Sequence, residues 1–401
     1  MKFITFLYPY DIRNIEAPHI WLLYKQLEKI SPENLFCIGS NDYFNGKQCF
    51  KEEKRWEVNW AEKGWRVSDD ITNKYVINKD IFKALESIEV TPNRVWSSLI
   101  SEVYPPLVSA LESYFEVIIQ ENSIDAIYTL CNCASLSQVS KKYNIPIIHI
   151  ELGALRAPHY INTAYFDFKG VNGNTESKNR YEDFISEENY KNKVPFLGRE
   201  QLLGFIRRNN NDKAKGLIKK ITRKIRSLLK RYRSDEYEIG LPLQVEDDSN
   251  MLSYSKGFNN IELISYAHKY FSKEKVLVRK HPGGHAHYKV ENNDDSLSPY
   301  QFLDRCKRIV TINSSMGLEA LLNGKPAWIT GESPFSFCSS QTINLDEYQE
   351  AKNLDERLNF AVFGYLVPFD LLFDLEYINF RLNHPKETDI YLKHFNFWMH
   401  G

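Results

Sequence analysis

A short polar segment, Asn313-Ser314-Ser315, carries residue types that can bind an anion. It follows the apolar residues 309–312 and precedes Met-Gly-Leu-Glu, where helix formers begin. The first turn of a helix offers unpaired N–H groups and a positive dipole end. The two serine hydroxyls add donors, so we expect a phosphate site here. Glu319, one helical turn further on, could hold a ribose hydroxyl. The alternative is an ordinary helix cap with a first-turn carboxylate, and both readings can hold together.

A cationic segment, Lys280-His281-Pro282, follows the expected strand 275–279, whose central residues 276–278 are apolar. Its side chains should emerge at the rim of a sheet, next to the Ser-Ser turn, where Lys280 and His281 could contact the same phosphate. The alternative is a surface loop in which proline merely ends the strand. His285 and His287 lie close by, but two intervening glycines and the lack of a nearby carboxylate make a metal site a poor interpretation. We expect no metal.

The segment 240–250, Gly-Leu-Pro-Leu-Gln-Val-Glu-Asp-Asp-Ser-Asn, is an apolar strand that ends in an acidic turn. Gln244 and Asp248 stand at the strand end, where open α/β sheets place their ligands. An isolated carboxylate such as Asp248 could act as a nucleophile or stabilise an oxocarbenium ion. A solvated loop would explain the same acidic residues.

Glu151 and Arg156 follow the apolar strand 145–150, and Gly153 between them permits a sharp turn. Glu151 could deprotonate an acceptor hydroxyl. Arg156 could bind a carboxylate or a phosphate. A simple Glu-Arg ion pair is the equally weighted alternative.

The elements that would position these residues alternate between apolar strands and amphipathic helices. In the first third, strands are expected at residues 3–7, 34–38, 126–130 and 145–150, and helices at 20–27, 107–119 and 135–143. In the second half, strands are expected at 239–245, 275–279, 309–312 and 326–329, and helices at 259–271, 299–306 and from 316. Continuous apolar strands separated by helices indicate parallel sheets covered on both faces.

Between these two halves the pattern changes. Residues 160–198 are rich in Asn, Gly, Ser and charge and are interpreted as loops, followed by a helix at 199–206. Residues 213–233 form a basic helix in which ten of 21 residues are Lys or Arg. Its apolar stripe could dock on the protein itself, or the helix could make a peripheral contact with anionic lipid. The last 40 residues are apolar and helical in pattern.

Composition limits the class of protein. The chain has 401 residues, which favours two domains. A formal net charge of −1 gives no global attraction to nucleic acid, and no apolar run is long enough to span a bilayer. The six cysteines have no metal or redox spacing and are interpreted as free thiols in a reducing cytoplasm. The glycine motifs typical of NAD and ATP sites are missing from the sequence, which disfavours both cofactors.

Four of these segments, in this order, resemble the retaining β-Kdo transferases of bacterial capsule and O-antigen assembly. They are E-x-G-x-x-R at 151–156, P-L-Q-x-x-x-D-S at 242–249, K-H-P at 280–282 and N-S-S-x-G-L-E-A-L-x-x-G-K-P at 313–326. The last motif occurs widely among nucleotide-sugar transferases, whereas the second is more specific. Residues 1–150 match only in general pattern.

The resemblance implies an α/β fold of two facing Rossmann-like domains (GT-B-like) with an interdomain cleft. We expect an acceptor-side domain at 1–235 that includes the basic helix, a donor nucleotide domain at 236–360, and a C-terminal helical segment at 361–401. It further implies CMP-β-Kdo as donor substrate with no cofactor, and a lipid-linked saccharide acceptor in lipopolysaccharide O-antigen or capsule synthesis. The protein would work in the cytoplasm, at the inner face of the cytoplasmic membrane.

The implied site has Asp248 at the anomeric carbon, in a double displacement that retains configuration. Gln244, Lys280, His281, Ser314, Ser315 and Glu319 would bind the donor nucleotide, and Arg156 a substrate. Glu151 or His281 would take the acceptor proton. Two alternatives stay open, namely a transferase for another CMP- or UDP-activated sugar and a non-catalytic sugar-binding or scaffold module. The chain could also be one module of a longer protein.

Overall fold

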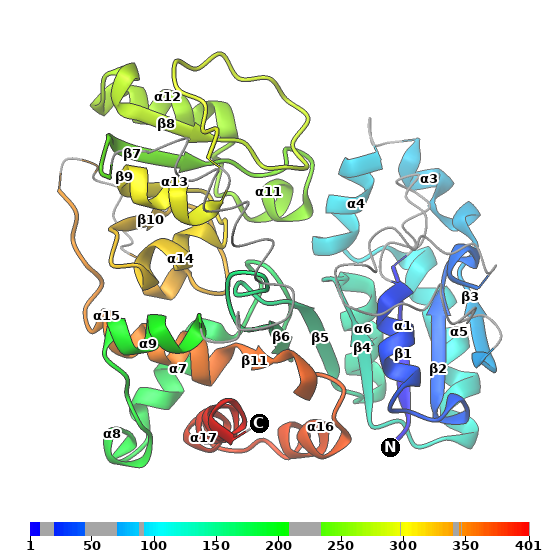
Figure 1. Cartoon of the computed structure of the whole chain (residues 1–401). Coiled ribbons are helices and arrows are strands. Elements are labelled where there is room, and N and C mark those ends of the chain that lie inside the picture. The colour runs from blue at the N-terminus through cyan, green and yellow to red at the C-terminus, as the bar shows by residue number, and fades with distance from the viewer. Residues whose placement is uncertain are drawn as a thin grey trace, which may run out of the picture. The chain divides into compact units, whose positions relative to one another are not determined.

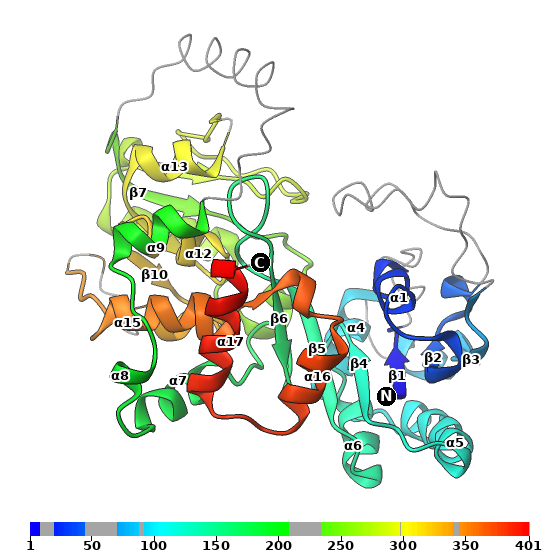
Figure 2. The same ribbon diagram turned by 60° about the horizontal axis from the view of Figure 1, so that its bottom comes forward.

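The computed structural model describes residues 1–8, 20–44, 70–87, 92–207, 234–296, 298–339, 345 and 347–400. Within these ranges the chain forms two compact units, each built on a β-sheet with helices (Figures 1 and 2). The first unit comprises Met1–Glu151, Tyr165–Val171 and Asp370–His384, and the second comprises Leu152–Ala164, Asn172–Phe369 and Pro385–Gly401. The predicted α/β class is confirmed. The cleft between facing domains stays a prediction.

The first sheet is parallel over most of its width and has the order β11-β6-β5-β4-β1-β2-β3. Its strands are apolar and largely buried, because helices cover both faces. Figure 2 shows α1 on one face and α5 and α6 on the other. The strands are β1 (Phe3–Phe6), β2 (Leu35–Gly39), β3 (Asn73–Val76), β4 (Ala126–Thr129), β5 (Ile147–Leu152), β6 (Thr163–Asp167) and the antiparallel β11 (Val367–Pro368). The helices are α1 (Ile20–Leu27), α3 (Lys83–Glu86), α4 (Pro92–Ser101), α5 (Pro105–Glu121), α6 (Ala134–Tyr143) and α16 (Leu375–Leu382).

The second sheet is wholly parallel, with the order β10-β9-β7-β8. Figure 1 shows α12 on one face and α13 and α14 on the other. The α12 face buries an apolar cluster that includes Ile239, Leu263 and Trp328. The strands are β7 (Tyr237–Pro242), β8 (Val276–Arg279), β9 (Cys306–Thr311) and β10 (Ala327–Ile329), and the helices are α11 (Ser249–Tyr254), α12 (Asn260–Tyr270), α13 (Pro299–Arg305) and α14 (Met316–Leu322).

The remaining helices of the second unit come from two distant parts of the chain. They are α7 (Ser177–Ser186), α8 (Tyr190–Lys193), α9 (Arg199–Ile206), α15 (Leu354–Asn359), a π-helix over Phe360–Tyr365, and α17 (Glu387–His400). The buried Arg180 of α7 makes an ion pair with Glu387 of α17 at 2.8 Å and also donates to the Gly364 carbonyl at 3.0 Å. Figure 2 shows α7 beside α17.

The prediction of loops throughout 160–198 is therefore wrong, since β6, α7 and α8 lie there. The helical stripe of α7 is short and mostly polar, and only Tyr181 and Phe184 mark its buried face. The compact units also have other bounds than the predicted domains, because the segment after β6 packs on the C-terminal helices. The predicted basic helix 213–233 lies outside the described residues. Of the helices in the described part of the chain, none has the length and apolarity that crossing a membrane requires.

Candidate active site

The carboxyl ends of β7, β8 and β9 lie at one edge of the second sheet, because these strands run parallel. The polar segments singled out in the sequence follow these three ends. We call this edge, made of residues 243–248, 280–288 and 312–317, the carboxyl edge. It gathers the predicted donor-binding residues other than Glu319, and all of them lie within one unit of the fold.

The Ser-Ser turn begins α14 directly after β9. The Ser314 hydroxyl accepts from the Met316 N–H at 3.3 Å, and Ser315 is the first residue flanking the helix, without a side-chain cap. A Cβ on Gly317 would lie 2.8 Å from Ile329 Cγ1, so only glycine lets the first turn approach β10 this closely. The Ser314 N–H donates to Thr311 Oγ1 at 3.4 Å and the Gly317 N–H donates to the Ser314 carbonyl at 2.9 Å, so the turn is held in shape at the strand end, directly before the start of α14.

Gln244 connects two parts of this edge. Its side-chain Nε2 donates to Asn313 Oδ1 at 2.9 Å, and Asn313 Nδ2 donates to the Asn250 carbonyl at 3.0 Å. Asn313 is buried, so these bonds satisfy polar atoms that water does not reach. Gln244, predicted to bind the donor, thus positions the Ser-Ser turn through Asn313.

Asp248 is the N-cap of α11 and is exposed at the carboxyl edge. Its Oδ1 accepts from the Asn250 N–H at 2.8 Å. Among the described residues no group hydrogen-bonds to its second oxygen, Oδ2. One carboxylate oxygen is therefore held in place while the other can meet a ligand, which suits a positioned nucleophile.

His281 lies near three charged groups of the same unit. Partial burial is the largest cause that lowers its pKa, and the Arg156 cation lowers it further, while the charges of Asp248 and Glu246 raise it. Its Nδ1 accepts from the Gly283 N–H at 3.1 Å, which places the proton of the neutral ring on Nε2. His281 can therefore donate from Nε2 to a bound anion. Lys280, by contrast, donates to the Ala286 carbonyl at 2.9 Å, and this bond stabilises the loop after β8.

In the sequence Glu246 is one of three consecutive acidic residues after the strand. In the structure its carboxylate forms hydrogen bonds with the loop after β8. Its carboxylate accepts from the Tyr288 hydroxyl at 2.5 Å and from the His285 N–H at 2.8 Å, with a third bond from the Ala286 N–H at 3.3 Å. Burial raises its pKa, but these bonds outweigh burial and lower it to about 2. Glu246 thus stabilises the loop after β8.

Arg156 and Glu319 belong to the same unit, although 163 positions separate them. The exposed Arg156 lies in the turn after Gly153, where any Cβ would collide with Thr163. Burial raises the pKa of Glu319 to about 7, against the hydrogen bond from Tyr160 and the charges of Arg156 and Arg279. The Tyr160 hydroxyl donates to Glu319 Oε2 at 3.2 Å. Tyr160 was not identified from the sequence, and no local motif marks it.

Glu151 lies in the first unit, at the end of β5, where its charge adds to the rise in the pKa of the buried Cys131 thiol. Two residues earlier in β5, His149 is buried beside Asp167. Burial lowers the pKa of His149 to about 4, although Asp167 opposes the shift. His149 is the one polar residue in the otherwise apolar run 145–150.

The described residues contain no group of three or more His, Cys, Asp or Glu side chains that could hold a metal ion. The five cysteines within these residues are buried free thiols. Of the site residues predicted from the sequence, Asp248 contributes an exposed carboxylate and His281 an imidazole at the carboxyl edge, and the Arg156 charge acts on His281.

Comparison with known proteins gives two family matches. Residues 5–176 match the glycosyltransferase 99 family N-terminal domain, and residues 189–367 match the family described as capsule polysaccharide biosynthesis protein. A comparison with curated proteins gave no match.

Solved structures are similar at low identity. The β-Kdo 2,7 transferase of KpsC from Thermosulfurimonas dismutans has a TM-score of 0.39 at 17% identity, with 67% of this chain and 90% of that chain covered. The β-Kdo 2,4 transferase of the same protein has 0.36 at 13%, covering 65% and 87%. The UDP-GlcNAc 2-epimerase from Neisseria meningitidis has 0.29 at 11%, covering 98% and 99%. Since these TM-scores lie below 0.5, the family rests on the sequence models.

Proposed function

We propose that this chain is a retaining β-Kdo transferase that uses CMP-β-Kdo. The proposal is supported by the matches to the glycosyltransferase 99 family N-terminal domain and to the capsule polysaccharide biosynthesis protein family. One observation carries the proposal. The charges of Asp248 and Arg156 both act on His281, and all three residues belong to the same unit as the Ser-Ser turn. A carboxylate next to an anion-binding turn is what displacement of a nucleotide from a sugar needs.

In the proposed reaction, Asp248 Oδ2 attacks the anomeric carbon of the donor while the bond from that carbon to the CMP phosphate oxygen breaks. CMP leaves as an anion, stabilised by the His281 Nε2–H, by Arg156 and by the start of α14 after Ser314 and Ser315. The acceptor hydroxyl then attacks the glycosyl–aspartate ester. Its proton passes to a base, the ester bond breaks, and two inversions give net retention.

The remaining predicted residues have supporting parts in this proposal. Glu319 holds a ribose hydroxyl of CMP, and Gln244 and Lys280 keep the turn and the loop in place. The base that accepts the proton of the acceptor is either Glu151, or His281 after its Nε2 proton has passed to the departing CMP phosphate. The acceptor is a lipid-linked saccharide of capsule or O-antigen synthesis, met in the cytoplasm at the inner membrane face. The proposal involves no metal and no cofactor.

The test is a thermal-shift panel of CMP, UMP, UDP and GDP on the whole chain, followed by mass spectrometry with CMP-Kdo. Ligand binding to the folded state raises its stability. We expect stabilisation by CMP above the others, and a covalent adduct of one Kdo on Asp248. Preference for UDP would indicate another donor, no nucleotide binding would indicate a non-catalytic module, and transfer without any adduct in slowed variants would contradict the double displacement.

A further inference from the structure

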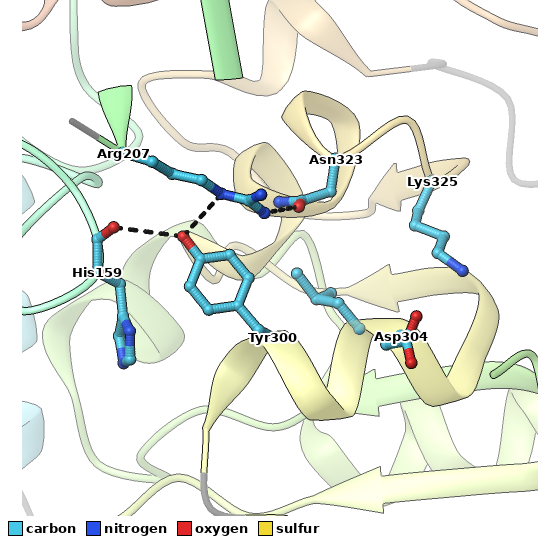
Figure 3. Close-up of a pocket in the computed structure, with 7 residues that line it drawn as sticks. His159, Arg207, Tyr300, Asp304, Asn323 and Lys325 are labelled. Atoms are coloured by element: carbon cyan, nitrogen blue, oxygen red, sulfur yellow. Dashed lines mark hydrogen bonds between the residues drawn. The ribbon is translucent and has the colours of Figure 1, made fainter. Parts of the chain in front are cut away.

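A second cavity of the second unit lies away from the carboxyl edge. Its volume is about 450 Å³, within the range of small-ligand sites. It opens between the end of α9, the helix α13 and the residues after α14 (Figure 3). The polar side chains on its wall are His159, Arg207, Tyr300, Asp304, Asn323 and Lys325.

Arg207 is held rigidly in this wall by neutral groups. Its Nε donates to the Tyr300 hydroxyl at 3.2 Å, a terminal nitrogen donates to Asn323 Oδ1, and the guanidinium lies 4.5 Å from the Tyr300 ring centroid. Among the residues that the structure describes, no carboxylate forms an ion pair with Arg207. Its charge is therefore available to a ligand in the cavity, and its planar donors match a carboxylate.

The opposite side of the cavity carries charges of both signs, as Figure 3 shows for Asp304 and Lys325. Lys325 donates to Asp235 at 2.6 Å, and Ser234 donates to Asp304 at 3.2 Å. A sugar hydroxyl can both donate and accept a hydrogen bond. A carboxylate, which accepts, next to an ammonium group, which donates, therefore suits two vicinal hydroxyls. The two aspartates disfavour a ligand with two negative charges.

Tyr300 does not act as a stacking platform for a sugar. Arg207 covers one face of its ring, and the imidazole of His159 meets the ring edge-on with centroids 5.2 Å apart. Its hydroxyl also donates to the His159 carbonyl at 3.3 Å. Recognition in this cavity must therefore come from charge and hydrogen bonds.

We propose that this cavity is a second ligand site that binds an acidic sugar, with the sugar carboxylate on Arg207 and vicinal hydroxyls on Asp304 and Lys325. The site does not depend on the nucleotide chemistry proposed above. Tyr160 contacts both places, since its ring lies 5.5 Å from Tyr300 and its hydroxyl reaches Glu319. The ligand class fits a sugar unit of an acidic polysaccharide.

The first experiment measures binding of glucuronate, glucose and glucose 6-phosphate to the whole chain by calorimetry, with CMP present and absent. We expect glucuronate to bind at least about tenfold more tightly than glucose, because a bidentate charged pair is lost with the neutral sugar. It should also bind more tightly than the dianionic phosphate. Equal affinity for glucose and glucuronate, or no binding of glucuronate, would overturn the proposal. CMP binding, read in the same titrations, reports on the nucleotide site separately.

Variants then assign the binding to this cavity. Arg207→Gln should weaken the binding of glucuronate about tenfold. Arg199→Gln, at the other end of α9, should change the dissociation constant of glucuronate by no more than about twofold. His281→Gln should also leave it unchanged, and loss of glucuronate binding there would move the ligand to the carboxyl edge. Asp304→Asn is a change at an exposed position. It should lower the ratio of the glucuronate affinity to the glucose 6-phosphate affinity at least threefold. An unaltered preference would contradict the site even if Arg207→Gln failed to fold.

Discussion

Replacing Glu319 by Gln should stabilise the protein at high pH and change it little at low pH. Glu319 is 7% exposed, and burial raises its pKa from 4.5 to about 7. The folded state therefore binds more protons than the unfolded state between these values, so the stability that this group contributes is present below pH 4.5 and lost as the pH rises toward 7. Glutamine keeps the shape and can still accept the Tyr160 hydroxyl, but it carries no charge to bury.

The size of the effect follows from the shift. At pH 8 the buried carboxylate destabilises the folded state by roughly 3 kcal/mol, and at pH 5 by roughly 1 kcal/mol. The difference in the free energy of unfolding between the variant and the wild type should therefore be roughly 2 kcal/mol larger at pH 8 than at pH 5. For a folding unit of about 150–250 residues this corresponds to about 4–8 °C in the unfolding midpoint.

The assay is scanning calorimetry of the wild type and Glu319→Gln at pH 5 and pH 8. Glu188→Gln, which removes an exposed carboxylate of the same unit, is the matched control and should show no comparable change. A midpoint difference between wild type and Glu319→Gln that is equal at both pH values would refute the reasoning. If the ionised carboxylate also holds a ribose hydroxyl, CMP affinity of the wild type should fall as the pH drops through 7, and that of the variant should be lower and flat.

Three further results are expected at the carboxyl edge. Asp248→Asn keeps a good N-cap residue, so the chain should fold and bind CMP within about twofold, yet lose transfer by at least ~10³-fold in a radiolabelled assay; near-normal turnover would exclude it as nucleophile. His281→Gln should weaken CMP about tenfold in calorimetry, and an unchanged dissociation constant would remove His281 from the phosphate. Glu246→Gln should speed amide exchange at His285 about tenfold, and equal protection would argue against the carboxylate as the group that holds this loop.

The sequence predicts the elements best where periodicity and packing agree. The helices at 20–27 and 199–206 have the predicted bounds, and the parallel strands β7 to β10 lie where apolar runs stand. Polar segments with few apolar positions, such as α7, cannot be recognised, because their stability comes from tertiary contacts like the Arg180–Glu387 pair. Sequence order also hides that the turn carrying Arg156 belongs to the second unit.

The candidate site shows the same division. The strand-end positions of Asp248, His281 and Ser314 follow from motif and topology. What these side chains do locally depends on partners far away in sequence, such as Tyr160 for Glu319 and Tyr288 for Glu246. No pattern in one sequence specifies such pairs, so the sequence places Glu246 in an acidic turn but does not show that its carboxylate accepts hydrogen bonds from the loop after β8.

The bonds around Glu246 have a consequence for how a ligand can enter. With a pKa of about 2, this carboxylate stays ionised at every physiological pH, so its three hydrogen bonds do not titrate away. The loop over residues 281–288 is thus ordered before any ligand arrives. Binding then loses little conformational entropy in this segment, and the dissociation constant need not include a loop-closing equilibrium. For a ligand bound at the carboxyl edge as proposed, contacts with this ordered loop would set the affinity, without induced fit of the loop.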